Sequence, residues 1–156
     1  MSIYTASVSN VTLSTSNDSI TLTPGANRRI QLLSVSVGGM GTASAANELG
    51  VFQVTTVGVT GAGAITPNAC SGDGLAPASA STVNTAWTTQ PVVGGEIISL
   101  PVNSNGGLYR YKFAPDEPVY AVGLAAATRV TPQISFRSKV GTGSVSITIT
   151  WMEDPL

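Results

Sequence analysis

The chain contains few residues that could perform covalent or acid–base chemistry. It has no histidine, which removes the commonest general base and metal ligand. Cys70 is the only cysteine, so an intramolecular disulfide is impossible. Without a histidine, neither this thiol nor a serine hydroxyl has the usual base to activate it. We therefore expect no enzymatic activity and no catalytic residue.

Acidic pairs and glycine clusters are the remaining candidates for a catalytic or ligand site. The pairs at residues 116–117 and 153–154 are adjacent in sequence, and neighbouring residues of a strand point to opposite faces, which makes them poor acid–base pairs. The glycine clusters at 38–41 and 61–63 lack the lysine and the following helix of a phosphate loop. Asp73 fits a turn better than a calcium ligand. The sequence predicts no cofactor and no metal site.

Basic and aromatic side chains on the predicted strands could form binding surfaces but not a catalytic site. Arg110 and Lys112 share one strand face, as do Arg137 and Lys139, so a positive patch forms if these strands are neighbours. The alternative is that they are solvated or are inter-subunit partners for Asp116, Glu117 and Glu153. The aromatic residues at 109–113 would suit a sugar platform, although such a row more often belongs to a core. So few charges predict no direct contact with nucleic acid.

The composition favours a protein whose surface is covered by neighbours. The chain has 156 residues, the size of one domain. Only 10% of them are charged and the net charge is −1, whereas a typical domain is about 25% charged. With 42% hydrophobic residues the chain is not expected to be disordered. The long uncharged stretches contain Gly and Pro, and residues 1–5 lack signal-peptide features, so we expect no membrane span and no signal peptide.

Residues 144–153 carry the clearest structural pattern. Apolar side chains occupy every second position, and Ser or Thr fills the gaps up to residue 150. A period of two is typical of a strand with one buried face. The buried row is predicted to be Val145, Ile147, Ile149 and Trp151. Its uncharged Ser/Thr face need not meet bulk water and is expected to suit a neighbouring subunit.

The remaining pattern predicts an all-β fold. The strand at 29–37 changes phase between Leu32 and Leu33, either because both faces are buried or because a bulge re-aims the strand. Hairpin turns are predicted at 103–107 and 141–143, and one helical turn at 42–48. Further strands are expected at 49–59, 96–102, 108–113, 119–122 and 133–140.

These elements predict a single antiparallel β-sandwich, jelly-roll-like, with about eight strands and a long loop at 60–95. That loop packs either on its own domain or on a neighbouring subunit, and Trp87 argues that it is ordered. Residues 1–27 are expected to form an N-terminal arm or edge strand, and residues 28–156 the sandwich domain. No basic residue precedes Arg28, so this arm could not neutralise a packaged genome.

Several phrases of the sequence resemble small structural proteins encoded in tailed-bacteriophage genomes. They stand at 28–37 (RRIQLLSVSV), 42–49 (TASAANEL), 64–67, 84–91 (NTAWTTQP), 108–111, 115–118 and 151–153. The resemblance covers about residues 28–153. It implies a virion protein that decorates or cements the outer surface of a capsid, with the major capsid protein and its own copies, most often as a homotrimer, as partners. No catalytic residue carries over.

The predicted assembly contacts are spread along the chain, with Trp87 as the expected anchor. A receptor- or glycan-binding module of a phage tail or fibre is the alternative function, and it requires exposed aromatics and an open groove. A major shell protein of a small jelly-roll virus is a third hypothesis, which the absence of a basic arm disfavours. The contacts are expected at Ile3, Tyr4, Leu75, Trp87, Pro91, Arg28 and Arg29.

Overall fold

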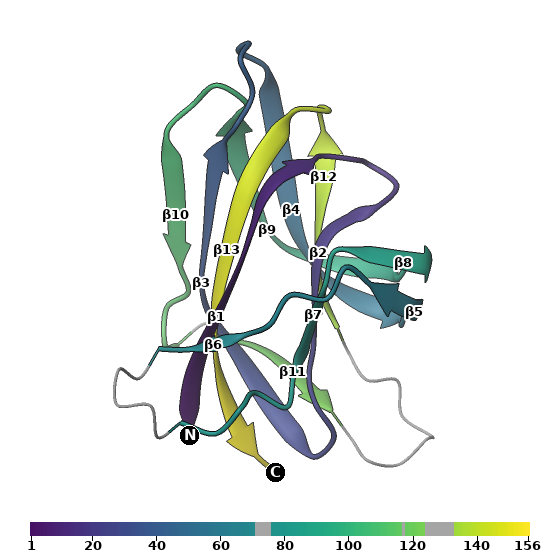
Figure 1. Ribbon diagram of the computed structural model, residues 1–156, viewed down its shortest axis with the longest axis vertical. Helices are drawn as coiled ribbons and strands as arrows, with labels where there is room; N and C mark the ends of the chain where they lie inside the picture. The colour runs from purple at the N-terminus through teal and green to yellow at the C-terminus, as the bar shows by residue number, and fades with distance from the viewer. Residues whose placement is uncertain (71–75, 117, 124–132) are drawn as a thin grey trace.

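Two antiparallel sheets packed face to face form the protein (Figure 1). The computed structural model describes residues 1–70, 76–116, 118–123 and 133–156, and these contain strands but no helix. The one-turn helix expected at 42–48 is therefore wrong: residues 42–43 form a bend and a strand begins at Ala46. A few residues without a packed apolar face cannot hold a helix.

Each sheet has a continuous order of hydrogen-bonded strands. Sheet A runs β10-β3-β13-β1-β6, with β11 also on β3; sheet B runs β7-β2-β12-β4-β9; and β5 pairs with β8 in a small third sheet. The strands of sheet A are β1 (Ser2–Thr12), β3 (Arg28–Gly39), β6 (Asn68–Ala69), β10 (Leu108–Lys112), β11 (Val119–Gly123) and β13 (Ser144–Pro155). The others are β2 (Asp18–Thr23), β4 (Ala46–Thr56), β5 (Val59–Ala62), β7 (Thr82–Asn84), β8 (Ala86–Thr89), β9 (Val92–Asn103) and β12 (Ile134–Val140).

The strand order is that of a jelly roll. Strands β10 and β11 pair with successive halves of β3, so together they act as one interrupted strand. Sheet A then has the order β1-β13-β3-β10/β11, facing β2-β12-β4-β9 in sheet B, which makes the eight strands of a double-sheet jelly roll. The prediction of an all-β antiparallel sandwich is confirmed.

The chain changes sheet at most of its connections. The segments at 103–107 and 141–143 join β9 to β10 and β12 to β13, and in both cases the two strands belong to different sheets. The predicted hairpins are therefore wrong. A tight turn does form at the first, where the Gly106 N–H donates to the Asn103 carbonyl at 2.9 Å. Turn residues specify a reversal of the chain but not the strand with which the returning segment pairs.

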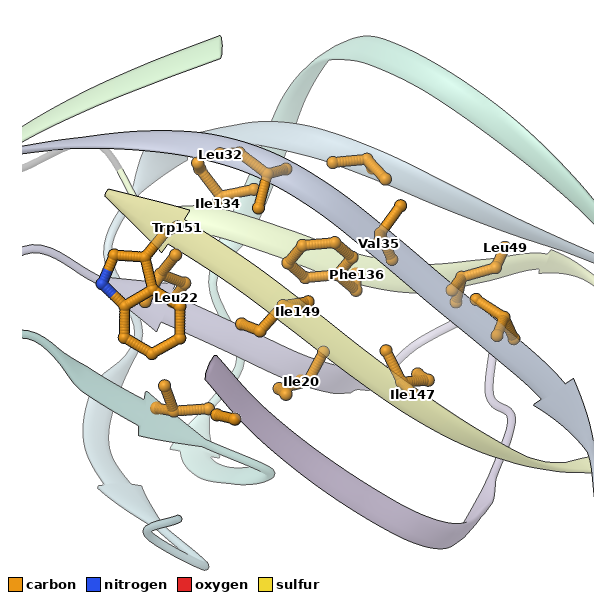
Figure 2. Close-up of a cluster of buried hydrophobic side chains, with 14 of the residues drawn as sticks. Ile20, Leu22, Leu32, Val35, Leu49, Ile134, Phe136, Ile147, Ile149 and Trp151 are labelled. Atoms are coloured by element: carbon orange, nitrogen blue, oxygen red, sulfur yellow. The ribbon is translucent and has the colours of Figure 1, made fainter. Parts of the chain in front are cut away.

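The core lies between the inner faces of the two sheets (Figure 2). Strand β13 lies between β1 and β3, and its predicted row is fully buried, with all four side chains at 0% exposure. These side chains meet those of sheet B, chiefly Ile20, Leu22, Leu49, Ile134 and Phe136. The predicted inward and outward faces of β13 are confirmed.

A bulge explains the phase change in β3. Ser34 lies opposite Thr150, but Leu32 lies opposite Trp151, so Leu33 is an extra residue in the ladder. Leu32 and Val35 are both fully buried on either side of it. The bulge alternative is therefore the one that occurs, and it keeps both halves of β3 facing the core.

The first 27 residues contribute two strands to the sandwich. Strand β1 pairs with β13 along its length and has only the two-residue β6 on its other side, so the edge-strand alternative describes it. Strand β2 lies inside sheet B between β7 and β12, with Ile20 and Leu22 fully buried. These residues do not extend as an arm, because their apolar rows complete the core.

The long segment at 60–95 packs on its own domain in the part that the structure describes. It contains β6, β7 and β8 and the ends of β5 and β9. Strand β7 pairs with β2, and β6 pairs with β1. Figure 1 shows β5 and β8 projecting to the side of sheet B.

Ile147→Asp is predicted to abolish folding, whereas Thr148→Arg leaves the fold intact. An unpaired carboxylate in the core should cost at least about 4 kcal/mol, while Thr148 lies on the partly exposed outer face. Chemical denaturation and circular dichroism would measure both. A soluble, cooperatively folding Ile147→Asp protein would show that the two faces of β13 are reversed.

Candidate functional site

Three of the predicted assembly contacts lie together at one end of sheet A. Ile3 on β1 is 42% exposed and lies opposite Met152 on β13. On β3, Arg28 lies 3.8 Å from Glu153 and Arg29 lies 3.5 Å from Asp154. The Arg29 guanidinium also stands 5.3 Å from the centroid of the Tyr120 ring. This end of the sheet holds exposed apolar and charged groups on adjacent strands.

Tyr4 belongs to the core and not to an accessible contact surface. It is 2% exposed, and its ring centroid lies 6.0 Å from that of Trp151. Its hydroxyl donates to the Pro77 carbonyl at 2.8 Å. The expectation that Tyr4 contacts a partner is therefore wrong, because tyrosine at this inward position of β1 buries its ring and pairs its hydroxyl. Leu75, a further predicted contact, lies outside the described residues.

Trp87 and Pro91 lie on the other side of the molecule, against the outer face of sheet B. Pro91 is buried, so it too is not an accessible contact. Trp87 is half-buried, and its Nε1 donates to Thr21 Oγ1 at 3.0 Å. The predicted contacts thus divide between two opposite surfaces and form no single site.

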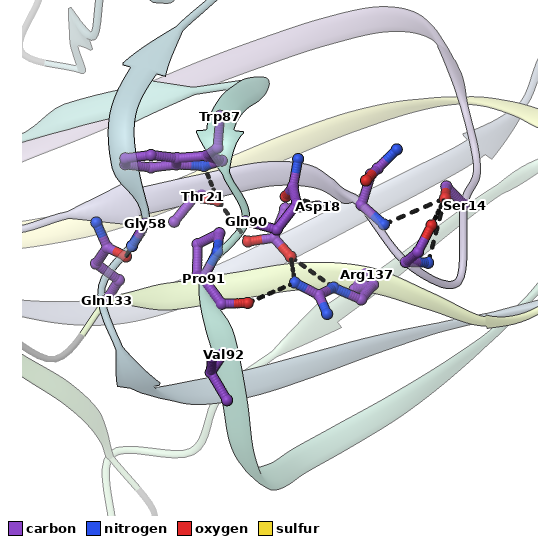
Figure 3. Close-up of polar contacts among 12 residues, drawn as sticks. Ser14, Asp18, Thr21, Gly58, Trp87, Gln90, Pro91, Val92, Gln133 and Arg137 are labelled. Atoms are coloured by element: carbon purple, nitrogen blue, oxygen red, sulfur yellow. Dashed lines mark hydrogen bonds and ion pairs between the residues drawn. The ribbon is translucent and has the colours of Figure 1, made fainter.

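A buried ion pair between Asp18 and Arg137 holds the segment that carries Trp87 (Figure 3). Arg137 Nη2 and Nε lie 2.6 and 2.7 Å from Asp18 Oδ1, and the side chains are 13% and 0% exposed. Asp18 Oδ2 accepts from Thr21 Oγ1 at 2.7 Å, and the Pro91 carbonyl accepts from Arg137 at 2.8 Å. Burying the charges of Asp18 and Arg137 would be costly if they were unpaired, and these contacts offset that cost.

An open groove lies beside Trp87. Its volume is about 500 Å³, which is within the range of small-molecule sites. Trp87 can lie along its wall because residue 58 is glycine: a Cβ there would come 2.6 Å from the indole ring. Its lining residues are Thr23, Pro24, Val57, Gly58, Gly61, Ala64, Thr82, Asn84, Trp87 and Gln133.

Polar groups in the groove are oriented by the protein itself. Gln133 Nε2 donates to Thr23 Oγ1 at 2.9 Å, and its Oε1 accepts from the Gly58 N–H at 3.3 Å. Asn84 Nδ2 donates to the Ala62 carbonyl at 3.4 Å. Both amides are largely buried, at 3% and 8% exposure. The sequence did not single out these two amides, since nothing local distinguishes them from other polar residues.

Glu153 fastens a second part of the long segment to sheet A. Its carboxylate accepts from Ser79 Oγ at 2.8 Å, the Ala80 N–H at 3.0 Å, and Ser81 Oγ and N–H at 2.8 and 3.3 Å. Burial by itself raises the pKa of this carboxyl. The hydrogen bonds together lower the pKa by a larger amount, so it lies below its ordinary value of 4.5. The sequence did not predict these contacts, because the serines that bind Glu153 are remote from it in sequence.

The outer face of sheet A carries an uncharged row of hydroxyl side chains on three adjacent strands. Thr148 on β13 pairs with Ser7 on β1 and with Ser36 on β3. Ser7 Oγ and Thr148 Oγ1 share a hydrogen bond of 2.8 Å. We call this surface the hydroxyl face. Its residues are Thr5, Ser7, Ser36, Ser146, Thr148 and Thr150, all exposed or partly exposed; Ser34, on the same side of the sheet, is buried.

The basic residues do not form one positive patch. Arg110 and Lys112 lie on β10 in sheet A, whereas Arg137 and Lys139 lie on β12 in sheet B. Arg137 pairs with Asp18, and Lys139 lies between two glutamates, Glu48 at 2.9 Å and Glu96 at 3.0 Å. The two basic residues of β12 are therefore paired within the chain, with acidic residues other than those expected as inter-subunit partners. In the part of the chain that the structure describes, no ion pair involves Arg110 or Lys112.

Of the aromatic residues at 109–113, two pack on the core. Tyr111 and Phe113 are partly buried, with ring centroids 5.0 Å apart in an edge-on arrangement. Tyr109 is 40% exposed. A single exposed ring at this place is not the continuous platform that a sugar-binding row would need.

Removing either partner of the buried pair should destabilise the protein more than removing both. Asp18→Asn and Arg137→Met should each lower the free energy of unfolding by about 3–5 kcal/mol, whereas the double variant should cost less than the sum. Urea denaturation measures all three. Arg29→Met, which breaks the exposed pair with Asp154, is the control and should cost at most about 1 kcal/mol. Additive costs at residues 18 and 137 would contradict the coupling.

Stability should fall in acid through Glu153. Its pKa is lowered in the folded protein, so the carboxylate contributes stability that is fully present above the unfolded pKa and lost as the pH falls through the folded pKa. Glu153→Gln should be less stable than the parent at pH 7, and the difference should shrink below the ordinary value of 4.5. Denaturation across this range measures the effect, with the exposed Asp116→Asn as control. An equal difference at all pH values would contradict it.

Comparison with known protein families and with curated proteins finds no match. Within the described residues, no helix is long and apolar enough to cross a membrane. The same part of the chain has no cluster of three His, Cys, Asp or Glu side chains that could hold a metal ion. Asp73, considered above as a calcium ligand, lies outside it. The surfaces that remain as candidates for function are the hydroxyl face and the Trp87 groove.

Proposed function

We propose that the protein decorates and stabilises the outer surface of a phage capsid, and that the hydroxyl face of sheet A is its contact surface. The observation that supports this is the difference between the two outer sheet faces. The segment around Trp87 and Pro91 covers part of sheet B, and the rest of that face carries the charged cluster of Glu48, Glu96 and Lys139. The residues of the hydroxyl face are uncharged, and no described segment covers them. The charged side chains on this side of sheet A, Arg110 and Lys112 on β10 and the Arg29–Asp154 pair, lie at the borders of the hydroxyl face.

The hydroxyl face is chemically suited to a protein contact. Interface cores are depleted in charged residues, because each buried charge must be desolvated and paired. Serine and threonine hydroxyls both donate and accept, so they can bond to the backbone or side chains of a partner. The short side chains leave a low surface on which a second protein surface can pack closely.

A basic edge borders this face. Leu108, Arg110 and Lys112 lie opposite Gly38, Ser36 and Ser34 on the neighbouring strand, so they point to the same side as the hydroxyl face. Leu108 is 74% exposed and lies over Gly38. A partner with an acidic rim would be attracted by the two cations, while the leucine would bury apolar area.

The partners in this proposal are the major capsid protein and further copies of this chain. A trimer presents three hydroxyl faces to a symmetric capsid surface, and the linked contacts then act together, so that weak individual contacts give strong attachment. The low overall charge fits a protein covered in this way. The trimer and the virion location follow from the sequence resemblance alone, and the shape of the sandwich is compatible with them.

Virion composition tests the role. Virions of the phage that encodes this chain should contain the protein on the head, at a fixed copy number relative to the major capsid protein. Quantitative mass spectrometry gives the ratio, and immunogold electron microscopy gives the position. Labelling confined to the tail would favour the receptor-binding alternative, and absence from the virion would exclude both roles.

Thr148→Arg and Ser36→Arg should weaken capsid binding roughly tenfold or more, because each places an unpaired charge in the contact. Binding of purified protein to capsids lacking it would be measured by co-sedimentation. Thr88→Arg, an exposed position on β8 away from sheet A, is the matched control and should bind like the parent. Capsid binding that is unchanged in both sheet A variants would remove the hydroxyl face from the proposal.

A further inference from the structure

We propose that the groove beside Trp87 binds a neutral saccharide. This goes beyond the capsid-decoration role and does not depend on it, because the groove belongs to the segment over sheet B and the hydroxyl face belongs to sheet A. The glycan-binding alternative required exposed aromatic side chains and an open groove, and this place has an open groove with a half-buried tryptophan in its wall.

The indole of Trp87 is only half-buried, unlike that of Trp151, which is fully buried in the core. Its Nε1 is bound to Thr21 and, through Thr21, to the buried pair of Asp18 and Arg137 (Figure 3). The ring is therefore held in place before any ligand arrives. A preorganised aromatic surface binds with a small loss of side-chain entropy.

Among the residues that the structure describes, none of those that line the groove is charged. An anionic ligand would find no cation to bind it, and a cationic ligand would find no carboxylate. The polar groups are instead the hydroxyls of Thr23 and Thr82 and the amides of Asn84 and Gln133. Amides and hydroxyls both donate and accept hydrogen bonds, as the hydroxyls of a sugar do.

A sugar ring combines the two properties that this groove offers. Its C–H face is apolar and suits the indole surface, while its edge carries hydroxyl groups that suit amides and hydroxyls. Gln133 and Asn84 are already oriented by hydrogen bonds to Gly58, Thr23 and Ala62. A purely apolar ligand would leave the remaining hydrogen-bonding capacity of these polar groups unused and shielded from water, which is unfavourable.

The position of the groove fits this role. Strands β5 and β8 project from the side of sheet B (Figure 1), so a molecule attached through sheet A would leave the groove open to the medium. The expected affinity is low, on the order of 1 mM for one site, and several copies on one particle would raise the effective binding to a glycan-coated surface.

An array of neutral and acidic glycans, probed with the full-length protein, identifies the saccharide. Titration with the best-bound neutral oligosaccharide then follows tryptophan fluorescence, in which Trp87 is the accessible one of the two tryptophans. We expect neutral glycans to bind, and Trp87→Ala to weaken binding at least about tenfold. Binding restricted to acidic glycans, or binding to none, would overturn the proposal.

Two further variants separate ligand binding from folding. Thr82→Arg obstructs the groove at an exposed position that does not support Trp87 and should also weaken binding at least about tenfold, with an unchanged unfolding midpoint. Thr88→Ala, next to Trp87 on β8, should bind like the parent. If Thr82→Arg and Trp87→Ala both fold and bind the oligosaccharide normally, the saccharide site lies elsewhere and the proposal is wrong.

Discussion

The alternation of inward and outward side chains along β13 is the constraint on which the rest of the sandwich depends. This strand lies between β1 and β3, and its inner row of Val145, Ile147 and Ile149 is fully buried. A slip of one residue would exchange that row with the hydroxyl row. The registers of β1 and β3 are therefore tied to it, and the bulge at Leu33 is the adjustment that keeps both halves of β3 facing the core.

Each sheet packs one face against the core and has one outer face, and the two outer faces differ in how far the long segment at 60–95 covers them. On sheet B, the Asp18–Arg137 pair and the Trp87 hydrogen bond hold the long segment in place. Glu153 fastens another part of the same segment with four hydrogen bonds. These contacts use charges that are rare in this chain, and they specify one position for a segment rich in Gly, Ala, Ser and Thr, which has little apolar area of its own to bury.

The division of the surface gives the two proposals a common physical basis. The hydroxyl face of sheet A is uncharged and broad, which suits contact with another protein surface. The groove beside Trp87 is small and concave, and its described lining residues are uncharged, which suits a sugar. A protein attached to a particle through one face and open to the medium on the other would have both properties without conflict between them.

The sequence by itself determined the all-β class, the central strand with its buried row, and the lack of a histidine-based catalytic site, because a period of two and the residue inventory are local properties. It did not determine which strands pair. The turns at 103–107 and 141–143 were predicted as hairpins, yet they join different sheets. Only the tertiary structure decided that Tyr4 and Pro91 are buried, that Asp18 meets Arg137 across 119 residues, and that Asn84 and Gln133 line one groove with Trp87. These contacts join positions far apart in sequence, and no local pattern records which distant residue will complete a buried charge or a groove wall.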